Sequence, residues 1–356
     1  MSTFNFTVRA TDDQDTYADR QFSINVKNDK MINCVVADGS NVYTTTNLGK
    51  DTMVTRPGVT TASLGSTMNT LTYGNGTWIA SNGTSYYTSV DGINWVLHSY
   101  PDYTSTTFSQ DTSYANNGNT YPLNNITFKN GYFFVVLRQE DKDATYFNYV
   151  LYSVDGINWK QFGTTWIRKA NSTMPSNDFY FDGEDLFIAM STNGYYRTTT
   201  DSSGNKIWSL VSVSSLSGTA MASAIGMVCI NGLWLLYSSN TLFTSNDLVT
   251  WTTRSGFTGN TELKYVNGRV VSLLDNTNTN YNYFIYSQDC ITWTSVKSTL
   301  SYTPNAGRAC MYKGSFIMVA SGGSVVSSSD GVTYTALTQG STGWPFSGSN
   351  GIASIV

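Results

Sequence analysis

The sequence predicts an all-β protein built from one repeated unit of four strands. Three observations support this. The stretch Ser-Val-Asp-Gly-Ile-Asn-Trp at residues 89–95 recurs at residues 153–159, and weaker copies follow at intervals of about 40–50 residues. Asn-Gly pairs separate apolar runs between these copies, which is typical of β-hairpins. No stretch of about 12 residues keeps the apolar period of a helix.

Each copy reads as a tight turn between two short strands. The Asp carboxylate can accept hydrogen bonds from backbone N–H groups of the turn, and the Gly that follows tolerates a positive φ. We expect the aromatic residue at the end of each copy to cover the base of its hairpin. A ring of equivalent turns cannot gather its carboxylates into one active site, so we predict structural roles for these aspartates. They are Asp91, Asp155, Asp247, Asp289 and Asp330.

Four strands at this period predict a blade of a β-propeller. Six complete units occupy residues 66–101, 121–164, 178–213, 222–256, 261–299 and 306–340. The two ends of the chain supply the rest of the ring. Residues 34–37 match a second strand, residues 41–45 match a third, and residues 351–356 match a first strand with no blade after it. We therefore expect residues 351–356 to join residues 32–58. This gives a seven-bladed β-propeller over residues 29–356 with a shared closing blade.

Residues 1–28 follow a different pattern. Two runs of alternating apolar and polar residues, 4–10 and 20–26, flank a turn-like segment, which predicts a β-hairpin. The pattern resembles the last two strands of cadherin-like and immunoglobulin-like repeats, whose sandwich needs roughly seven strands. Two strands alone are marginal in water. The hairpin is therefore expected either to pack on the propeller or to add to a partner's sheet as an anchor.

The composition limits the classes of function. Charged residues are only 12% of the chain, about half the usual share, and the polar residues are mainly Ser, Thr, Asn, Gly and Tyr. This mixture suits extracellular or virion surfaces. The net charge of −4, without a run of Lys or Arg, argues against nucleic-acid binding. No segment approaches the roughly 18 apolar residues of a membrane span, and the first residues do not resemble a conventional signal peptide.

Metal and cofactor chemistry has little support in the sequence. The cysteines have no paired spacing, and we expect buried free thiols at Cys34, Cys229, Cys290 and Cys310. His98 is the only histidine, so neither a zinc site nor a Ser-His-Asp triad is expected. No cofactor is predicted.

A binding surface is predicted on one face of the disc. With blade strands named A to D in chain order, the A–B and C–D turns lie on one face, and the more variable B–C and D–A connections lie on the other. Long B–C connections fall at residues 138–148 and 275–282, and the longest D–A connection spans residues 100–125. Tyrosines among Ser, Thr, Asn and Asp favour glycan or protein binding there, although they can equally cover the rim. The predicted ligand-binding residues, over blades 2–4, are Tyr103, Tyr114, Tyr146, Phe147 and Trp166.

The repeated turns carry a family resemblance. They resemble the Asp-box of bacterial sialidase-type propellers, which reads Ser-x-Asp-x-Gly-x-x-Trp and is one residue longer than residues 89–95. The shorter form is similar to repeats of bacteriophage virion proteins and predicted propellers. This resemblance implies a non-enzymatic viral structural protein, such as a tail fibre, adhesin or decoration component. Such a protein would be made in the host cytoplasm and exposed on the surface of the virion. It would bind other virion proteins through its hairpin, and it would contribute to host recognition by binding a carbohydrate or a protein.

Two alternatives remain open. A secreted glycan-active hydrolase of the Asp-box type would need two carboxylates about 5–10 Å apart. Candidates on the variable face are Asp102, Asp111, Glu140, Asp141 and Asp143. However, the arginines are scattered, and no Arg-Ile-Pro element precedes the repeats as in sialidases. A cellular assembly factor with a propeller scaffold is the second alternative.

Overall fold

The computed structural model describes residues 2–11, 17–26, 34–38, 41–45, 54–55, 68, 70–81, 85–100, 116–122, 126–141, 145–163, 167–170, 179–191, 194–212, 224–238, 241–259, 263–274, 283–297, 304–312, 314–320, 325–337 and 351–354. Every regular element in these residues is a β-strand, and the strands form a β-propeller. The all-β prediction is confirmed. Among the described residues, no helix is long and apolar enough to cross a membrane.

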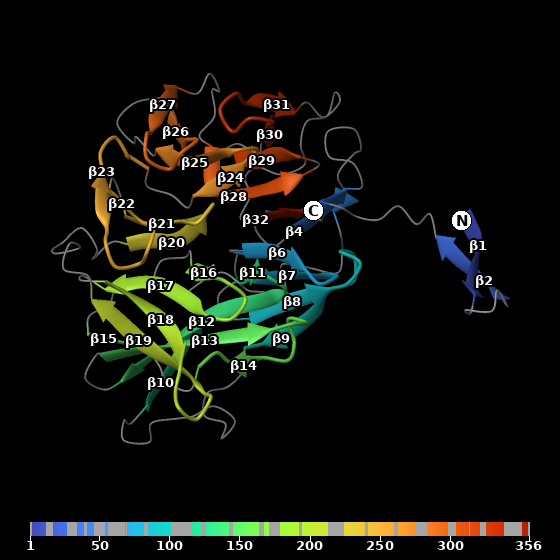
Figure 1. Ribbon diagram of the computed structural model, residues 1–356, viewed down its shortest axis with the longest axis horizontal. Helices are drawn as coiled ribbons and strands as arrows, with labels where there is room; N and C mark the ends of the chain where they lie inside the picture. The colour runs from blue at the N-terminus through green and yellow to red at the C-terminus, as the bar shows by residue number, and fades with distance from the viewer. Residues whose placement is uncertain are drawn as a thin grey trace.

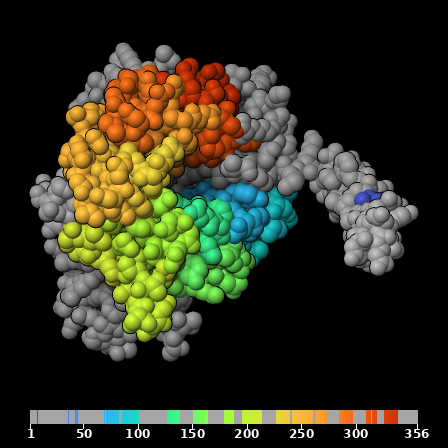
Figure 2. Space-filling view, viewed as in Figure 1, coloured from blue at the N-terminus to red at the C-terminus, as the bar shows by residue number. Residues whose placement is uncertain are grey.

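Six blades each come from one continuous stretch of the chain (Figure 1). The first blade contains β6 (Thr70–Gly74), β7 (Thr77–Ser81), β8 (Ser85–Ser89) and β9 (Val96–Ser99). The third blade contains β16 (Phe179–Phe181), β17 (Leu186–Ser191), β18 (Gly194–Thr200) and β19 (Lys206–Ser212), and the fourth contains β20 (Ala224–Ile230), β21 (Leu233–Ser238), β22 (Thr241–Ser245) and β23 (Thr252–Arg254). The fifth blade contains β24 (Lys264–Val266), β25 (Arg269–Leu274), β26 (Tyr283–Ser287) and β27 (Thr294–Lys297). The sixth contains β28 (Pro304–Tyr312), β29 (Ser315–Ala320), β30 (Val325–Ser328) and β31 (Thr335–Leu337). Figure 2 shows the blades packed side by side in chain order.

The two ends of the chain meet in a further sheet, which we call the closing sheet. Its order is β32 (Gly351–Ser354), β3 (Cys34–Asp38), β4 (Asn41–Thr45) and β5 (Val54–Thr55). Antiparallel pairing sets Cys34 opposite Ser354 and Val36 opposite Ile352. Strand β32 also contacts β28 of the sixth blade and β6 of the first. The prediction that the C-terminal residues complete the sheet beginning near Cys34 is confirmed.

The second strand of each blade supplies much of the core. All five residues of β7 are buried, and Leu235, Leu236 and Tyr237 of β21 are fully buried. These strands lie between other strands of their own sheet and between the sheets of neighbouring blades. Apolar side chains on both faces of the strand are therefore removed from water. This placement agrees with the continuous apolar run that follows each Asn-Gly pair in the sequence.

The second blade departs from the four-strand pattern. Its central strands, β12 (Tyr132–Asp141) and β13 (Thr145–Ser153), continue beyond the region that pairs with β11 (Thr127–Lys129) and β14 (Lys160–Gln161). In the continuation, β10 (Asn116–Pro122) pairs with β12, and β15 (Ile167–Ala170) pairs with β13. We call this four-stranded continuation the extension sheet. The prediction of a B–C loop over residues 138–148 is therefore wrong, because most of these residues extend the hairpin. The other predicted long loop, residues 275–282, lies outside the described residues.

The N-terminal residues form a sheet of their own. Strands β1 (Ser2–Thr11) and β2 (Tyr17–Val26) pair antiparallel, with Phe6 opposite Phe22. Figure 1 shows this hairpin, in blue, apart from the ring of blades. The hairpin thus forms as the alternating pattern predicts. The division at residue 28 stays a prediction.

Candidate functional site

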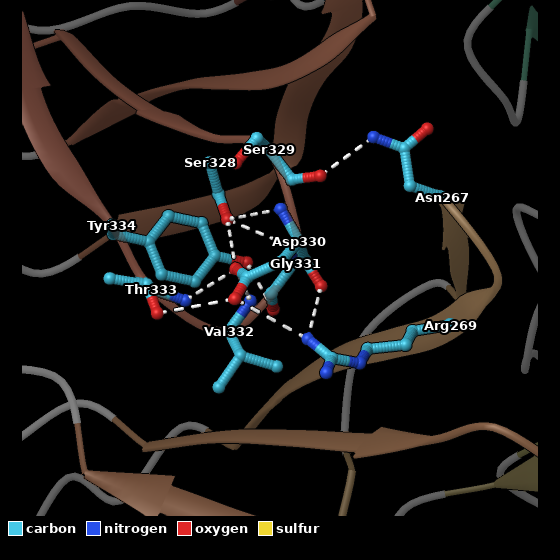
Figure 3. Close-up of polar contacts among 9 residues, drawn as sticks. All are labelled: Asn267, Arg269, Ser328, Ser329, Asp330, Gly331, Val332, Thr333 and Tyr334. Carbon is cyan, nitrogen blue, oxygen red and sulfur yellow. Dashed lines mark hydrogen bonds and ion pairs between the residues drawn. The ribbon is translucent and has the colours of Figure 1, made fainter.

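The repeated aspartate turns have a common geometry, seen clearly at Asp330 in the sixth blade (Figure 3). Its Oδ1 accepts hydrogen bonds from the backbone N–H of Val332 at 2.8 Å and of Thr333 at 2.7 Å, and from the hydroxyl of Ser328 at 3.0 Å. The Ser328 Oγ in turn accepts a hydrogen bond from the N–H of Gly331 at 2.8 Å. Serine, aspartate and the following backbone therefore close the turn on themselves.

The same bonds recur at the other four turn aspartates predicted to be structural. In each, the carboxylate accepts from the two backbone N–H groups that lie two and three residues later and from the preceding Ser. The aspartates are Asp91, Asp155, Asp247 and Asp289. A looser copy of the turn lies at residues 200–208 in the third blade. It keeps part of the pattern, because Asp201 accepts hydrogen bonds from the N–H groups of Ser203 and Asn205.

These bonds keep the turn carboxylates ionised. The pKa of Asp247 falls to about 2, chiefly because the backbone N–H groups of Thr250 and Val249 bind its charged form. Partial burial is the largest single influence on Asp91 and Asp330 and raises their pKa. The combined hydrogen bonds outweigh it, so both pKa values also fall to about 2. The pKa values of Asp155 and Asp289 are lowered as well. A carboxylate held this way is a poor proton donor or acceptor near neutral pH.

Asn side chains of the A–B turns join the first blade to the second and the fifth blade to the sixth. Asn75 donates its side-chain N–H groups to the carbonyl of Gly131 at 2.7 Å and to that of Val154 at 2.9 Å. These carbonyls belong to the A–B and C–D turns of the second blade. Asn267 makes the equivalent pair to Gly314 and Ser329 of the sixth blade, at 3.0 and 2.6 Å. Figure 3 shows the bond to Ser329. The A–B and C–D turns of adjacent blades therefore lie together on one face.

The aromatic residue that ends each turn packs on the preceding blade. Trp159 Nε1 donates to the hydroxyl of Tyr86 on β8 at 2.9 Å, and the two rings meet edge to face. Tyr334 stacks on Phe284 of β26 with ring centroids 4.0 Å apart. We predicted that these residues cover their own hairpins, and we did not predict that they pack between two blades. The recurrence of an aromatic residue at this position indicated a shared packing role. The strand on which it packs belongs to another blade and becomes known only from the assembled ring.

The remaining candidates for chemistry are dispersed. Cys229, Cys290 and Cys310 are free thiols, but only Cys290 is buried; Cys229 and Cys310 are half-buried, which corrects the prediction for these two. The side chain of Cys34 lies outside the described residues. His98 receives or donates one hydrogen bond with Thr88 and stacks on Tyr86. Among the described residues, no three His, Cys, Asp or Glu side chains are arranged to hold a metal ion.

The predicted ligand-binding residues fall into two groups. Tyr103, Tyr114 and Trp166 lie outside the described residues, as do the candidate acids Asp102, Asp111 and Asp143. Tyr146 and Phe147 lie on β13 in the extension sheet. Consecutive residues of a strand belong to opposite faces of the sheet. Tyr146 and Phe147 therefore belong to opposite faces of this sheet, whereas the sequence analysis placed both on one binding face of the disc.

The register of the extension sheet defines two rows of residues. Tyr146 lies opposite Glu140 on one side and Lys169 on the other. The adjacent row on the same face contains Tyr121, Arg138, Asn148 and Ile167. We call this the tyrosine face: two tyrosines among charged and amide residues. The opposite face contains Thr120, Gln139, Phe147 and Arg168 in one row.

Comparisons with known proteins support the fold but identify no family. No protein-family model matches the chain, and no curated protein sequence is significantly similar to it. Apo AztD from Citrobacter koseri is similar in structure, with a TM-score of 0.50, 9% identity and coverage of 91% of this chain and 97% of that one. YCF48 bound to D1 peptide gives a TM-score of 0.45 at 11% identity, covering 76% and 81%. A streptogramin B lyase gives 0.40 at 11%, covering 89% and 95%. At such identities a structural likeness shows the fold alone.

Proposed function

We propose that this chain is a non-enzymatic structural protein of a bacteriophage virion, displaying a propeller face that binds a glycan or protein on the host surface. The observation that carries the binding role is the extension sheet. It is an addition to one blade, so the ring does not need it. It also collects aromatic, charged and amide residues in neighbouring positions. Aromatic rings offer apolar faces to sugar C–H groups, and amides and charges can bind the hydroxyls.

The state of the turn aspartates supports the non-enzymatic part. Each carboxylate already accepts bonds from its own turn, and its pKa is lowered. A glycosidase requires one carboxyl group that stays protonated near working pH and a second one near it. Repetition of one turn around a ring provides neither. The virion assignment is supported by the resemblance of the short turn motif to phage repeats and by the charge-poor composition.

The finer architecture belongs to the same proposal. We infer that the closing sheet acts as a seventh blade, because its four strands have the order of a blade and β32 contacts both neighbouring blades. Such a closure ties the two ends of the chain together. It leaves the N-terminal hairpin as an arm outside the ring, which suits attachment of the propeller to another virion protein.

Single substitutions in the extension sheet test the binding role. Tyr146→Ala and Phe147→Ala report on opposite faces, and we expect Tyr146→Ala to weaken binding to intact host cells or to a glycan array by at least about ten-fold. Tyr265→Ala is the matched control, because Tyr265 is half-exposed beside the Asn267-Gly268 turn on the other face. Full binding by both extension variants, or release of cleaved sugars from any glycan that binds, would contradict the proposal.

A further inference from the structure

The only histidine of the chain lies beside the junction between the first two blades. His98 is on β9 and directly opposes Tyr86 on β8. The two rings stack with centroids 5.1 Å apart and an angle of 19° between their planes. His98 Nε2 also shares a hydrogen bond of 2.8 Å with the hydroxyl of Thr88, which is buried. The imidazole is thus half-buried and held by two residues of the neighbouring strand.

Tyr86 connects this histidine to the second blade. It is buried and belongs to one apolar cluster with Ile126 and Trp159 of that blade. Its hydroxyl accepts the 2.9 Å bond from Trp159 Nε1. The ring of Tyr100, the first residue of the connection predicted over residues 100–125, packs on Tyr86 with centroids 5.1 Å apart. Tyr86 therefore has the histidine on one side and the start of the connection and the second blade on the others.

The same cluster reaches the base of the extension sheet. Val135 and Leu137 of β12 belong to it, and both are fully buried. Leu137 lies opposite Pro122 of β10, where β10 pairs with β12 in the extension sheet. Strand β12 therefore contributes to the junction in its first half and to the extension sheet in its second half. Looser packing of the first blade on Leu137 would weaken the support of the strand that carries the proposed binding region.

The other blades show that the ring does not require a histidine here. The equivalent residues, three positions after the aromatic residue that ends each turn, are Phe162, Val211, Arg254, Val296 and Leu337. Four of the five are apolar. Phe162 packs edge to face on Phe181 of the following blade, with centroids 5.6 Å apart, so the position faces the next blade. His98 thus places a titratable group where most blades have an apolar one.

Burial favours the neutral form of this imidazole. A charged ring on Tyr86 could gain a cation–π contact, but the loss of hydration costs more, and burial lowers the pKa of His98 below its ordinary value of 6.5. The titratable groups around the stack are the hydroxyls of Tyr86 and Tyr100, and burial is the main reason why the pKa of each is raised. On the second blade, the carboxylate of Asp155 raises the pKa of Tyr86 further and is itself bonded within its own turn. Asp102, four residues after His98, lies outside the described residues.

We propose that His98 makes the junction between the first two blades sensitive to mild acid, which loosens Tyr86 from the second blade and weakens binding by the extension sheet. Neutral His98 can accept the hydrogen of the Thr88 hydroxyl, whereas the protonated ring can only donate. The charged ring must also regain water that the stack on Tyr86 excludes. The contribution of this contact to stability is therefore complete above pH 6.5, and it is lost as the pH falls from 6.5 through the lowered pKa of His98. Only the last step, binding, rests on the proposed function.

A single histidine makes the titration directly measurable. In the full chain labelled with ¹³C-histidine, NMR should show one imidazole signal that titrates below pH 6.5. Hydrogen exchange, corrected for the intrinsic rate, should show β8, β9 and β12 opening about three- to ten-fold more often at pH 5 than at pH 7. This range follows because a pKa difference of one between two states changes their equilibrium up to about ten-fold. The fourth blade should not respond, because Arg254 at the equivalent position keeps its charge at both pH values.

Two neutral variants provide the controls. His98→Phe copies the second blade, His98→Gln keeps an acceptor for Thr88, and the opening of β8, β9 and β12 should be the same at pH 7 and pH 5 in both. Binding of the wild type to intact host cells should weaken about three- to ten-fold at pH 5, and binding of the variants should not.

The outcomes separate this inference from the proposed function. A histidine signal that titrates above pH 6.5, or wild-type exchange that matches the variants at pH 5, would overturn the pH-sensitive junction. If exchange depends on His98 but host-cell binding does not change with pH, the link from the junction to binding is refuted. If the chain does not bind host cells even at pH 7, the proposed function fails, and the exchange measurement still decides whether the junction responds to acid.

Discussion

The aspartate turns occur in two forms that share a backbone but differ in the residue after the Asp. In the second and sixth blades this residue is Gly156 or Gly331, with φ of 74° and 73°. In the fourth and fifth blades it is Leu248 or Cys290, with φ of 63° and 61°. The left-handed conformation is therefore fixed by the turn, whereas the residue that adopts it varies. The carboxylate bonds are the same in both forms.

The preceding blade explains the difference. A Cβ on Gly156 would lie 2.3 Å from Ile79 Cδ1, and a Cβ on Gly331 would lie 2.6 Å from Val271 Cγ2. At the other two turns the neighbouring blade leaves room. Cys290 is buried among Leu235, Val270 and other apolar residues, and Leu248 packs beside Tyr195. Glycine is thus needed where blades approach closely, and a side chain fills the gap where they do not.

Acid should affect both forms together, because both depend on an ionised carboxylate. The folded-state pKa values of Asp91, Asp247 and Asp330 are about 2, below the ordinary value of 3.8. Between these values the unfolded chain binds more protons, so the stability that these turns contribute is complete above about pH 4 and falls as the pH drops toward 2. Urea unfolding at a series of pH values measures this loss. Asp330→Asn should reduce the slope, and stability unchanged from pH 4 to pH 2 would refute the argument.

Gly331→Ala should have the largest effect of the substitutions compared here, because its Cβ would overlap with the fifth blade. The left-handed conformation costs a residue with a Cβ about 1–2 kcal/mol, and the overlap with Val271 adds about 1–3 kcal/mol of overpacking. We expect a loss of about 2–5 kcal/mol in the free energy of unfolding. The measurement is urea or thermal unfolding.

Gly314→Ala is the matched control for that substitution. Gly314 has a φ of 74°, and a Cβ there would meet nothing within 4 Å. It should therefore cost only the backbone term, about 1–2 kcal/mol. Equal losses for Gly331→Ala and Gly314→Ala would show that close approach between blades has no part in the choice of glycine.

The sequence predicted the ring because its signals are local. Asn-Gly pairs and the Ser-x-Asp turns determine where each hairpin reverses, and few repeat architectures are compatible with four strands at that spacing. The closing sheet followed from the same logic, since residues 34–37 lacked a first strand and residues 351–356 lacked a blade. The bonds from Asn75 to the next blade were not predicted. Sequence identifies the turn, but the carbonyl partners exist only once two blades are side by side.

The candidate binding region was the least predictable part. Strand β10 has the sequence Asn-Asn-Gly-Asn-Thr-Tyr-Pro, which reads as a loop by composition. It becomes a strand because β12 extends far enough to pair with it. Tyr146 and Phe147 were assigned to one binding face because residues 138–148 were expected to form a loop on the variable face of the disc. Once β13 is known to be a strand there, the same adjacency separates them onto opposite faces.

Cys290→Gly tests the comparison in a turn that has a larger residue after the Asp. It should have the smallest effect on the free energy of unfolding. Removing the buried side chain loses about 1.5–2 kcal/mol of apolar burial, while relief of the left-handed strain returns about 1–2 kcal/mol. The net change should be no more than about 1 kcal/mol. Cys290→Ala keeps the strain and loses the sulfur contact, so it should be no more stable than Cys290→Gly. If Cys290→Gly lost as much free energy of unfolding as Gly331→Ala, the comparison would fail. Packing of the Cys290 side chain against the fourth blade would then be essential to the turn, rather than a filling of spare room.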